Sequence, residues 1–310
     1  MNQTRRQFIA TSSCAAVAAL SGSDQLAAAT APADIGAHIY KALKWNMIQT
    51  EGSVLDKFKM LKELGYDGVE LNSPDDVDKE EARAASEQTG LPVEGIVNAT
   101  HWRVRHSDPD PAVRAQALKN MQTAMHDAKK VGADSVLLVP GRVNDPEKEN
   151  HDHVWNRSIA DIRRLLPLAE ELKMRILIEN VGNGFCTDPT LFAQYIDEIN
   201  SPWVGAHFDI GNHIRYSPPA EWIRILGKRI RKLDVKDRIK GSRERVLIGN
   251  GDADWPSVRD AIKEVGYRGW AAAEVSGGNR QRLAEVLDRM NRVLGKSDGK
   301  PAKDLLGATR

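Results

Sequence analysis

Acidic side chains follow several apolar segments in the second half of the chain. The run of residues 175–178 is followed by Glu179, and the run 204–208 is followed by Asp209. Neighbouring buried carboxylates repel one another unless a cation lies between them. Hard oxygen ligands suit Mg²⁺ or Mn²⁺, with Zn²⁺ or Co²⁺ also possible. The alternative is that each carboxylate pairs with its own Lys or Arg. The acidic residues in question are Glu179, Asp209, Asp234, Asp237 and Glu274.

A repeated unit of apolar run, polar loop, amphipathic helix and glycine would position these carboxylates. The runs lack polar alternation, which is typical of parallel strands buried on both faces. Eight such units predict a (β/α)₈ barrel, a TIM barrel, in a single domain over residues 40–295. No Gly-x-Gly-x-x-Gly follows the first run, which removes the usual support for a dinucleotide-binding fold. The expected strands are residues 43–48, 67–71, 93–98, 135–139, 175–179, 203–208, 231–235 and 270–274.

Helix boundary signals support this division. Ser53 is a candidate N-cap for a helix that ends at Gly65, and Asp110-Pro111 opens a second helix that ends at Gly132. The segment 62–70 is closely similar to 263–270, which indicates an internally repeated αβ architecture.

The two ends of the chain are expected to lie outside the barrel. Arg5-Arg6 precedes an Ala- and Ser-rich run and a small-residue cluster, which predicts a twin-arginine signal peptide over residues 1–30. Residues 31–39 read as a linker and 296–310 as a flexible tail. The twin-arginine export machinery is then a partner, and the mature protein is expected to be periplasmic or secreted without a stable membrane anchor.

Composition weakens the case for a nucleic-acid-binding function and limits disulfide formation. The 44 basic and 43 acidic residues of the 310 give a formal net charge of +1, so no global basic field attracts nucleic acid. Removal of the signal peptide leaves Cys186 as a single cysteine, which cannot form an internal disulfide.

Four motifs carry a family resemblance. Ile178-Glu179-Asn180, Phe208 to Asn212, Val235-Lys236-Asp237 and Gly249 to Trp255 resemble the xylose-isomerase-like superfamily over roughly residues 40–295. That group includes sugar epimerases, hydroxypyruvate isomerase and relatives of endonuclease IV. The resemblance implies a metal-dependent enzyme and leaves its substrate open.

The resemblance also implies a ligand set. The isomerases and epimerases hold their metal with Glu, Asp, His and Glu from strands five to eight, which correspond to Glu179, Asp209, Asp234 and Glu274. Asp234 departs from the usual His and raises the negative charge of the site. Asn212 stands where relatives often have His, so the substrate-contacting role passes to His213.

The chemistry implied is proton transfer beside a carbonyl. The metal would stabilise an enediolate, and Glu179 and Glu274 would remove and return the proton. Return to the opposite face epimerises a sugar or keto-sugar, and return to the adjacent carbon isomerises it. Further substrate contacts are expected from His101, Trp102, Asn180, Lys236 and Glu70. Lys236 could neutralise substrate oxygens or pair with Asp237.

Three other functions stay open. The same metal and acid–base pair could serve a lyase or hydratase on 3-keto-sugars or keto-glycosides. An endonuclease IV-like nuclease would need more His ligands than this chain offers, and a binding protein would not need intact Glu179 and Glu274. The chain could also form a homo-oligomer.

Overall fold

The structure, a computed structural model, describes residues 35–242 and 244–301. These residues belong to one compact unit. The predicted signal peptide and most of the predicted tail lie outside the described residues, so export stays a prediction. Among the described residues, no helix combines the length and apolar character needed to span a bilayer.

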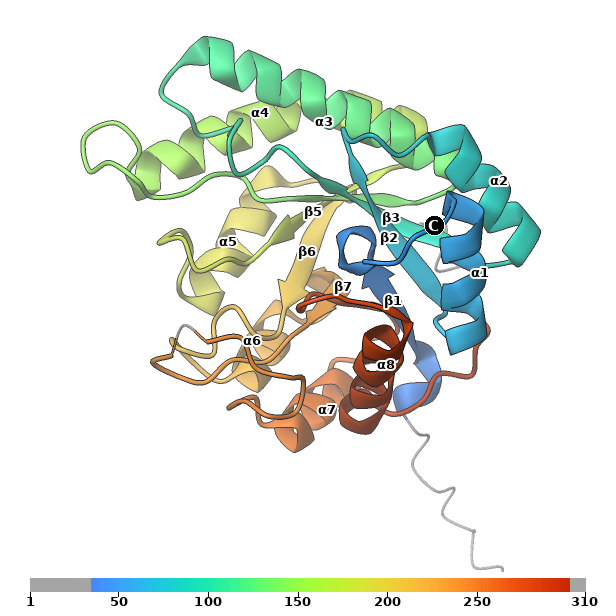
Figure 1. Cartoon of the computed structure of the whole chain (residues 1–310). Coiled ribbons are helices and arrows are strands. Elements are labelled where there is room, and N and C mark those ends of the chain that lie inside the picture. The colour runs from blue at the N-terminus through green and yellow to red at the C-terminus, as the bar shows by residue number, and fades with distance from the viewer. Residues whose placement is uncertain (1–34, 243, 302–310) are drawn as a thin grey trace, which may run out of the picture. The chain divides into compact units, whose positions relative to one another are not determined.

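The strands form one closed parallel barrel in the order β1 to β8, which confirms the predicted (β/α)₈ fold (Figure 1). Each strand pairs with its sequence neighbours, and β1 closes the cylinder against β8. The carboxyl ends of all eight strands therefore open at the same end of the barrel. The strands are β1 Ile39–Lys44, β2 Gly68–Ser73, β3 Val93–Asn98, β4 Ser135–Leu138, β5 Arg175–Glu179, β6 Val204–Asp209, β7 Ile230–Val235 and β8 Gly269–Ala273.

The predicted bounds of the first strand, residues 43–48, are wrong. The structure places β1 at Ile39–Lys44 and a short 3-10 helix at Trp45–Met47. Lys41 and Lys44 interrupt the apolar pattern of the true strand, yet both are buried. Nζ of Lys41 donates a hydrogen bond to the carbonyl oxygen of Ile39 at 2.6 Å. This bond offsets part of the cost of burying a charged side chain.

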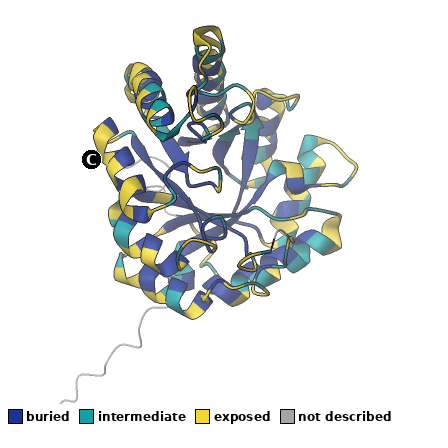
Figure 2. Cartoon of the chain, turned by 90° about the vertical axis from the view of Figure 1, so that its left-hand side faces the viewer, coloured by how far each residue is buried: buried dark blue, intermediate teal, exposed yellow. Residues whose placement is uncertain are grey.

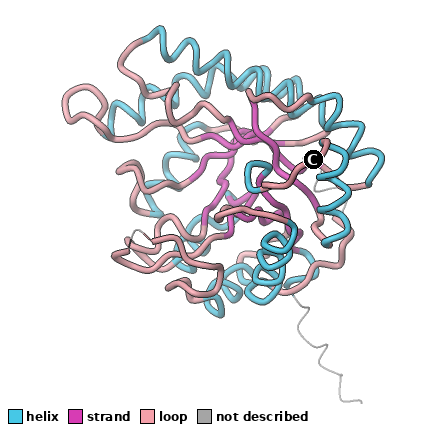
Figure 3. The backbone as a smooth tube through the Cα atoms, viewed as in Figure 1, coloured by secondary structure: helices cyan, strands magenta, loops and turns pink. Residues whose placement is uncertain are grey.

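The α-helices surround the strands (Figure 3). Ser53 caps α1 in a reciprocal capping box with Asp56, and Gly65 ends that helix with φ of 95°. Gly132 ends α3 in the same left-handed conformation, with φ of 79°. The helices are α1 Val54–Leu64, α2 Lys79–Thr89, α3 Pro111–Val131, α4 His151–Leu172, α5 Pro189–Ile199, α6 Pro219–Leu226, α7 Trp255–Glu264 and α8 Arg280–Leu294.

The hydrophobic core lies between the strands and the helices, whose outer faces are exposed (Figure 2). The interior of the cylinder is different because it contains ion pairs. Lys232 on β7 contacts Glu94 on β3, and its Nζ lies 3.8 Å from Asp134. A Cβ on Gly95 would lie 2.6 Å from Nζ of Lys232, so the glycine makes room for this ammonium group. The interior below the strand ends is therefore a charged layer that depends on paired partners.

Removal of one partner of the Lys232–Glu94 pair should destabilise the barrel strongly. We expect Lys232→Met to lower the free energy of unfolding by about 3–5 kcal/mol, because Glu94 would remain buried without its cation. Adding Glu94→Gln should recover part of the loss. Denaturant unfolding followed by circular dichroism measures both values. The matched control is Arg83→Met, which removes an exposed partner of Glu87 and should cost less than about 0.5 kcal/mol. A loss below about 1 kcal/mol for Lys232→Met would show that the buried pair contributes little.

Candidate metal centre

Four carboxylates converge where β5 to β8 end. Glu179, Asp209, Asp234 and Glu274 each offer an oxygen atom, and these oxygens all lie within 4.8 Å of one another. The first three residues are buried, whereas the Glu274 side chain is 38% exposed and reaches the opening of the barrel. The structure thus brings together the four residues predicted as metal ligands, including the two predicted to transfer protons.

Asp234 has cationic neighbours on two sides. Nζ of Lys44, at the end of β1, lies 2.9 Å from Oδ2 of Asp234 and 3.0 Å from Glu70. Nε2 of His207, on β6, lies 3.0 Å from Oδ1 of Asp234. Although burial alone would raise the pKa of Asp234, Lys44 and His207 hold it well below its ordinary value. Asp234 is therefore an anion at any physiological pH.

Lys236 bridges two of the other carboxylates. Its Nζ lies 2.7 Å from Asp209 and 2.6 Å from Glu274. The predicted alternative, a pair between Lys236 and Asp237, is wrong, because Lys236 extends into the barrel opening. A Cβ on Gly211 would lie 2.5 Å from Cγ of Lys236, so the glycine after β6 admits the lysine stem.

Asp237 instead holds the loop that follows β7. Its carboxylate accepts hydrogen bonds from the backbone N–H groups of Arg238, Gly249 and Ala253, at 2.9 to 3.1 Å. It also accepts one from the indole Nε1 of Trp255 at 3.0 Å. The buried carboxylate of Asp237 thus connects the start of the loop after β7 with its end, beside the four carboxylates.

Two asparagines orient the carboxylates of β5 and β6. Asn180 accepts from the backbone N–H of Asp209 at 2.7 Å and donates to the carbonyl of Asp209 at 3.0 Å. Asn212 donates to Oε1 of Glu179 at 3.0 Å. Oδ1 of Asp209 accepts from the N–H groups of Gly211 and Asn212, which leaves Oδ2 directed at the cluster. Asn180, a predicted substrate contact, uses its side chain within the protein, and Asn212 takes a positioning role that the sequence did not reveal.

Three other predicted substrate contacts, Trp102, His101 and Glu70, differ in their exposure to solvent. Trp102 is 47% exposed and contacts the ring of His101, whose Nδ1 accepts from the N–H of Val139 at 3.3 Å. Burial lowers the pKa of His101 to about 3, so this imidazole is neutral. Glu70 is 1% exposed and lies with Lys44 below the opening.

His213 is not brought into the cluster. Its Nε2 lies 3.1 Å from the carbonyl oxygen of Val181, and its ring packs on Trp222 with centroids 4.4 Å apart. Burial lowers the pKa of His213 to about 4. The observed contacts of this histidine are structural.

Comparison with known proteins places the chain in a family. A family model described as Xylose isomerase-like TIM barrel matches residues 58–293. The chain belongs to this family. Proteins similar in sequence or in structure provide a comparison for the four carboxylates.

Two of three similar proteins are described as epimerases of sugars or sugar derivatives, and the third was solved with zinc. L-ribulose-5-phosphate 3-epimerase UlaE of Salmonella paratyphi A is 25% identical over 228 residues, which cover 69% of this chain and 79% of the relative. The crystal structure of 3-keto-D-glucoside 4-epimerase YcjR from E. coli superposes with a TM-score of 0.69 at 18% identity, over 82% of this chain and 98% of that one. The IOLI protein, solved with a zinc atom, gives a TM-score of 0.71 at 16% identity, over 82% and 98% of the two chains. At these identities the two superpositions show the shared fold.

The donor set of this chain fits a divalent cation. Oδ2 of Asp209 and both oxygens of Asp234 are buried and accept no hydrogen bond of regular geometry among the described residues, although cationic groups lie near them. Lys44 and Lys236 pair with four carboxylates in this region, namely Glu70, Asp209, Asp234 and Glu274, and Glu179 is a fifth carboxylate in the same cluster. An all-oxygen set with surplus negative charge suits a hard divalent ion such as Mg²⁺ or Mn²⁺. Glu179, Asp209, Asp234 and Glu274 would hold it.

A second group of three side chains lies deeper. Glu70, His207 and Asp234 also bring ligand atoms within 4.8 Å of one another. Nζ of Lys44 contacts two of these three residues, so an ammonium group already supplies positive charge there. Lys236 likewise contacts two of the four carboxylates above, so the two groups differ in composition: the deeper one has two carboxylates and an imidazole, and the upper one has four carboxylates.

The pKa values of the two strand-end glutamates are shifted in opposite directions. Burial, followed by the charges of Glu274 and Asp234, raises the pKa of Glu179 well above its ordinary value. Burial would also raise the pKa of Glu274, but Lys236 and Lys44 outweigh it and lower that pKa. Burial raises the pKa of Asp209 to about 7 despite the nearby Lys236. In the metal-free protein the cluster therefore retains protons at neutral pH.

These raised pKa values predict pH-dependent metal binding. Below about pH 7 Asp209 is protonated in the metal-free protein, and burial raises the pKa of Glu179 as well, so an incoming ion must displace protons. We expect the dissociation constant for Mn²⁺ to fall by up to about tenfold per pH unit as pH rises through about 7, once for each proton released. Calorimetry in two buffers of different ionisation enthalpy measures both the affinity and the protons released.

Asp209→Asn is the matched variant for this measurement, because it keeps the side-chain shape and removes one titrating ligand. It should bind Mn²⁺ more weakly and release fewer protons. An affinity that does not change between about pH 6 and about pH 8 would contradict the assignment of Asp209 and Glu179 as ligands.

Proposed function

We propose that the chain is a divalent-metal-dependent sugar epimerase or isomerase that moves a proton at the carbon next to a carbonyl group. The observation that carries the proposal is the set of four carboxylate oxygens within 4.8 Å, two of them from glutamates at the ends of β5 and β8. Membership of the Xylose isomerase-like TIM barrel family and similarity to a sugar epimerase support it.

Glu179 and Glu274 are the proton-transfer groups in this proposal. They come from strands separated around the barrel, so they approach a bound substrate from different sides. Asn212 fixes one oxygen of Glu179, and Lys236 holds Glu274. One glutamate removes the proton and the other returns it, which inverts the carbon or shifts the carbonyl.

The remaining residues prepare the site for this transfer. A divalent ion held by the four carboxylates supplies electrophilic stabilisation of the negative charge that develops on the substrate oxygens. Lys236 adds a fixed positive charge beside Glu274. Trp102, exposed at the opening, offers an aromatic surface for a sugar ring.

Solvent exchange tests the proposal directly. The protein, loaded with Mn²⁺, is incubated in D₂O with free ketoses and with 3-keto-glucosides, and products are followed by NMR. We expect deuterium beside the carbonyl together with an epimer or isomer of unchanged carbon skeleton. Glu179→Gln and Glu274→Gln should each slow exchange by about 10²- to 10⁴-fold, because each variant lacks one proton-transfer group.

Glu171→Gln is the control, because Glu171 is an exposed glutamate on α4 rather than a residue at a strand end. It should exchange deuterium at the unaltered rate. Undiminished exchange in Glu274→Gln would show that the proton-transfer assignment is wrong. An elimination product in place of exchange would assign the same site to a lyase.

A further inference from the structure

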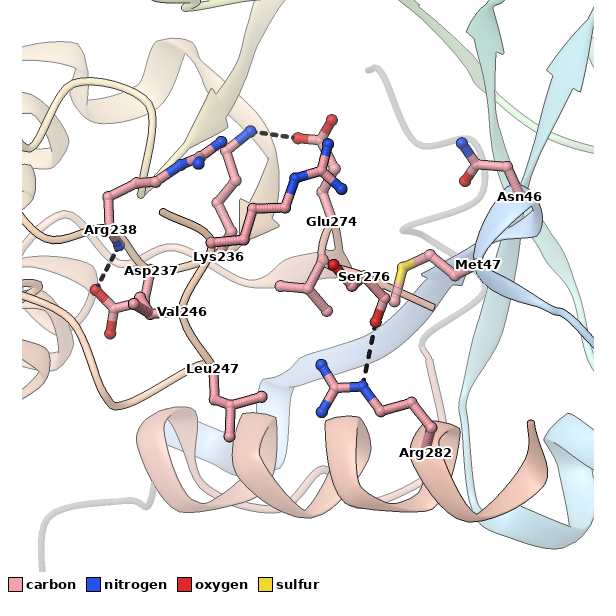
Figure 4. Close-up of a pocket in the computed structure, with 12 residues that line it drawn as sticks. Asn46, Met47, Lys236, Asp237, Arg238, Val246, Leu247, Glu274, Ser276 and Arg282 are labelled. Carbon is pink, nitrogen blue, oxygen red and sulfur yellow. Dashed lines mark hydrogen bonds and ion pairs between the residues drawn. The ribbon is translucent and has the colours of Figure 1, made fainter. Parts of the chain in front are cut away.

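A second feature of the barrel opening is a cavity of about 260 Å³ beside Glu274 (Figure 4). Its walls come from the short 3-10 helix after β1, the loop after β7, the loop after β8 and the start of α8. Met47, Val246, Leu247 and Val275 give it an apolar side. Its charged lining residues are Lys236, Asp237, Arg238, Arg245, Glu274 and Arg282.

The two acidic residues of this cavity are already satisfied by protein groups. Asp237 accepts four hydrogen bonds from its own loop and from Trp255, and Glu274 pairs with Lys236. Arg282 is also partnered, by Glu285 at 2.7 Å and by the carbonyl oxygen of Ser276 at 3.2 Å.

Arg238 and Arg245 differ from these residues in having no ion-pair partner among the described residues. Within residues 35–242 and 244–301, no carboxylate lies within 4.0 Å of either guanidinium group, and neither side chain donates a hydrogen bond to a protein acceptor. Arg238 is nevertheless half-buried, and Figure 4 shows it extending along the cavity toward Lys236. The cavity therefore carries an excess of positive charge that the described residues do not neutralise.

This arrangement suits a small anion. A guanidinium group presents a planar pair of N–H donors that matches the two oxygens of a carboxylate or phosphate. The apolar side formed by Met47 and Leu247 strengthens such contacts by excluding water. The hydrogen bonds of Asp237 fix the backbone from which Arg238 projects, so part of the ordering cost is met before a ligand binds.

We propose that this cavity binds an anionic end of the substrate, a carboxylate or a phosphate, with Arg238 and Arg245 as its principal contacts. The inference rests on the proposed function in one respect: the carbonyl end of the same molecule lies against Glu274, which both sites share. It assigns the preferred substrate to the acidic sugars, either sugar acids or sugar phosphates, with neutral ketoses as weaker-binding substrates.

Three matched ligands test the assignment: D-fructose, its C6 acid D-fructuronate, and D-fructose 6-phosphate. Calorimetry on the Mn²⁺-loaded protein should show at least one of the two anions binding about tenfold or more tightly than D-fructose. Arg238→Gln and Arg245→Gln should each reduce this preference by about tenfold, since each removes a charge-assisted contact. The two anions distinguish a carboxylate site from a phosphate site.

Lys240→Gln is the control for a change of charge in the same loop, because Lys240 is exposed and does not line the cavity. It should leave all three affinities unchanged. The Arg variants should fold normally, because neither side chain contacts an acceptor that its loss would leave unpaired, and circular dichroism verifies this.

The possible failures are distinguishable. Equal affinity for the three ligands, or an anion preference that survives both Arg substitutions, would overturn the assignment of the cavity. Deuterium exchange measured on the same ligands tests the proposed function separately. Arg-dependent anion binding without exchange on any ligand would contradict the epimerase proposal and leave the anion site in place.

Discussion

The barrel opening is organised around the repulsion between buried carboxylates. Glu70, Glu179, Asp209, Asp234 and Glu274 lie on five strands of one narrow cylinder, and burial makes their charged forms costly. Lys44 and Lys236 offset part of this charge from β1 and from the end of β7. Burial, together with the charge imbalance that remains, raises the pKa values of Glu179 and Asp209, and the surplus of carboxylates suits the site to a divalent ion.

The surrounding structure limits how these carboxylates can relieve their repulsion. Asn180 and Asn212 fix the orientations of Asp209 and Glu179 through hydrogen bonds between β5 and β6. The charged layer beneath, which includes Lys232, occupies the interior of the cylinder below these side chains. Of the five carboxylates, Glu274 is the part-exposed one, and it marks the side from which a substrate can approach. The arginine-lined cavity opens on this same side.

Sequence reasoning predicted the features that depend on local patterns. Strands two to eight, the helix cap at Ser53 and the strand-end positions of Glu179, Asp209 and Glu274 all followed from apolar runs and boundary residues. Residues at the ends of parallel strands meet at one edge, so the order of strands along the chain is enough to predict their proximity.

Features that depend on partners across the barrel could not be predicted. The role of Lys44 was not predicted, because two buried lysines interrupt the apolar pattern by which β1 would be recognised. Its contact with Asp234 also joins residues far apart in the sequence. The same applies to Asn180 and Asp237, which were expected to contact a substrate and to form an ion pair, respectively, but whose side chains bind within the protein. An individual polar residue carries no local signal that separates these uses.

We infer that the four carboxylates share one divalent ion. A crystal structure of the protein grown with Mn²⁺, recorded with anomalous scattering, tests this most directly. We expect a single anomalous peak bounded by oxygens of Glu179, Asp209, Asp234 and Glu274. Density without such a peak at saturating Mn²⁺, with Lys44 and Lys236 still balancing the carboxylates, would contradict the claim.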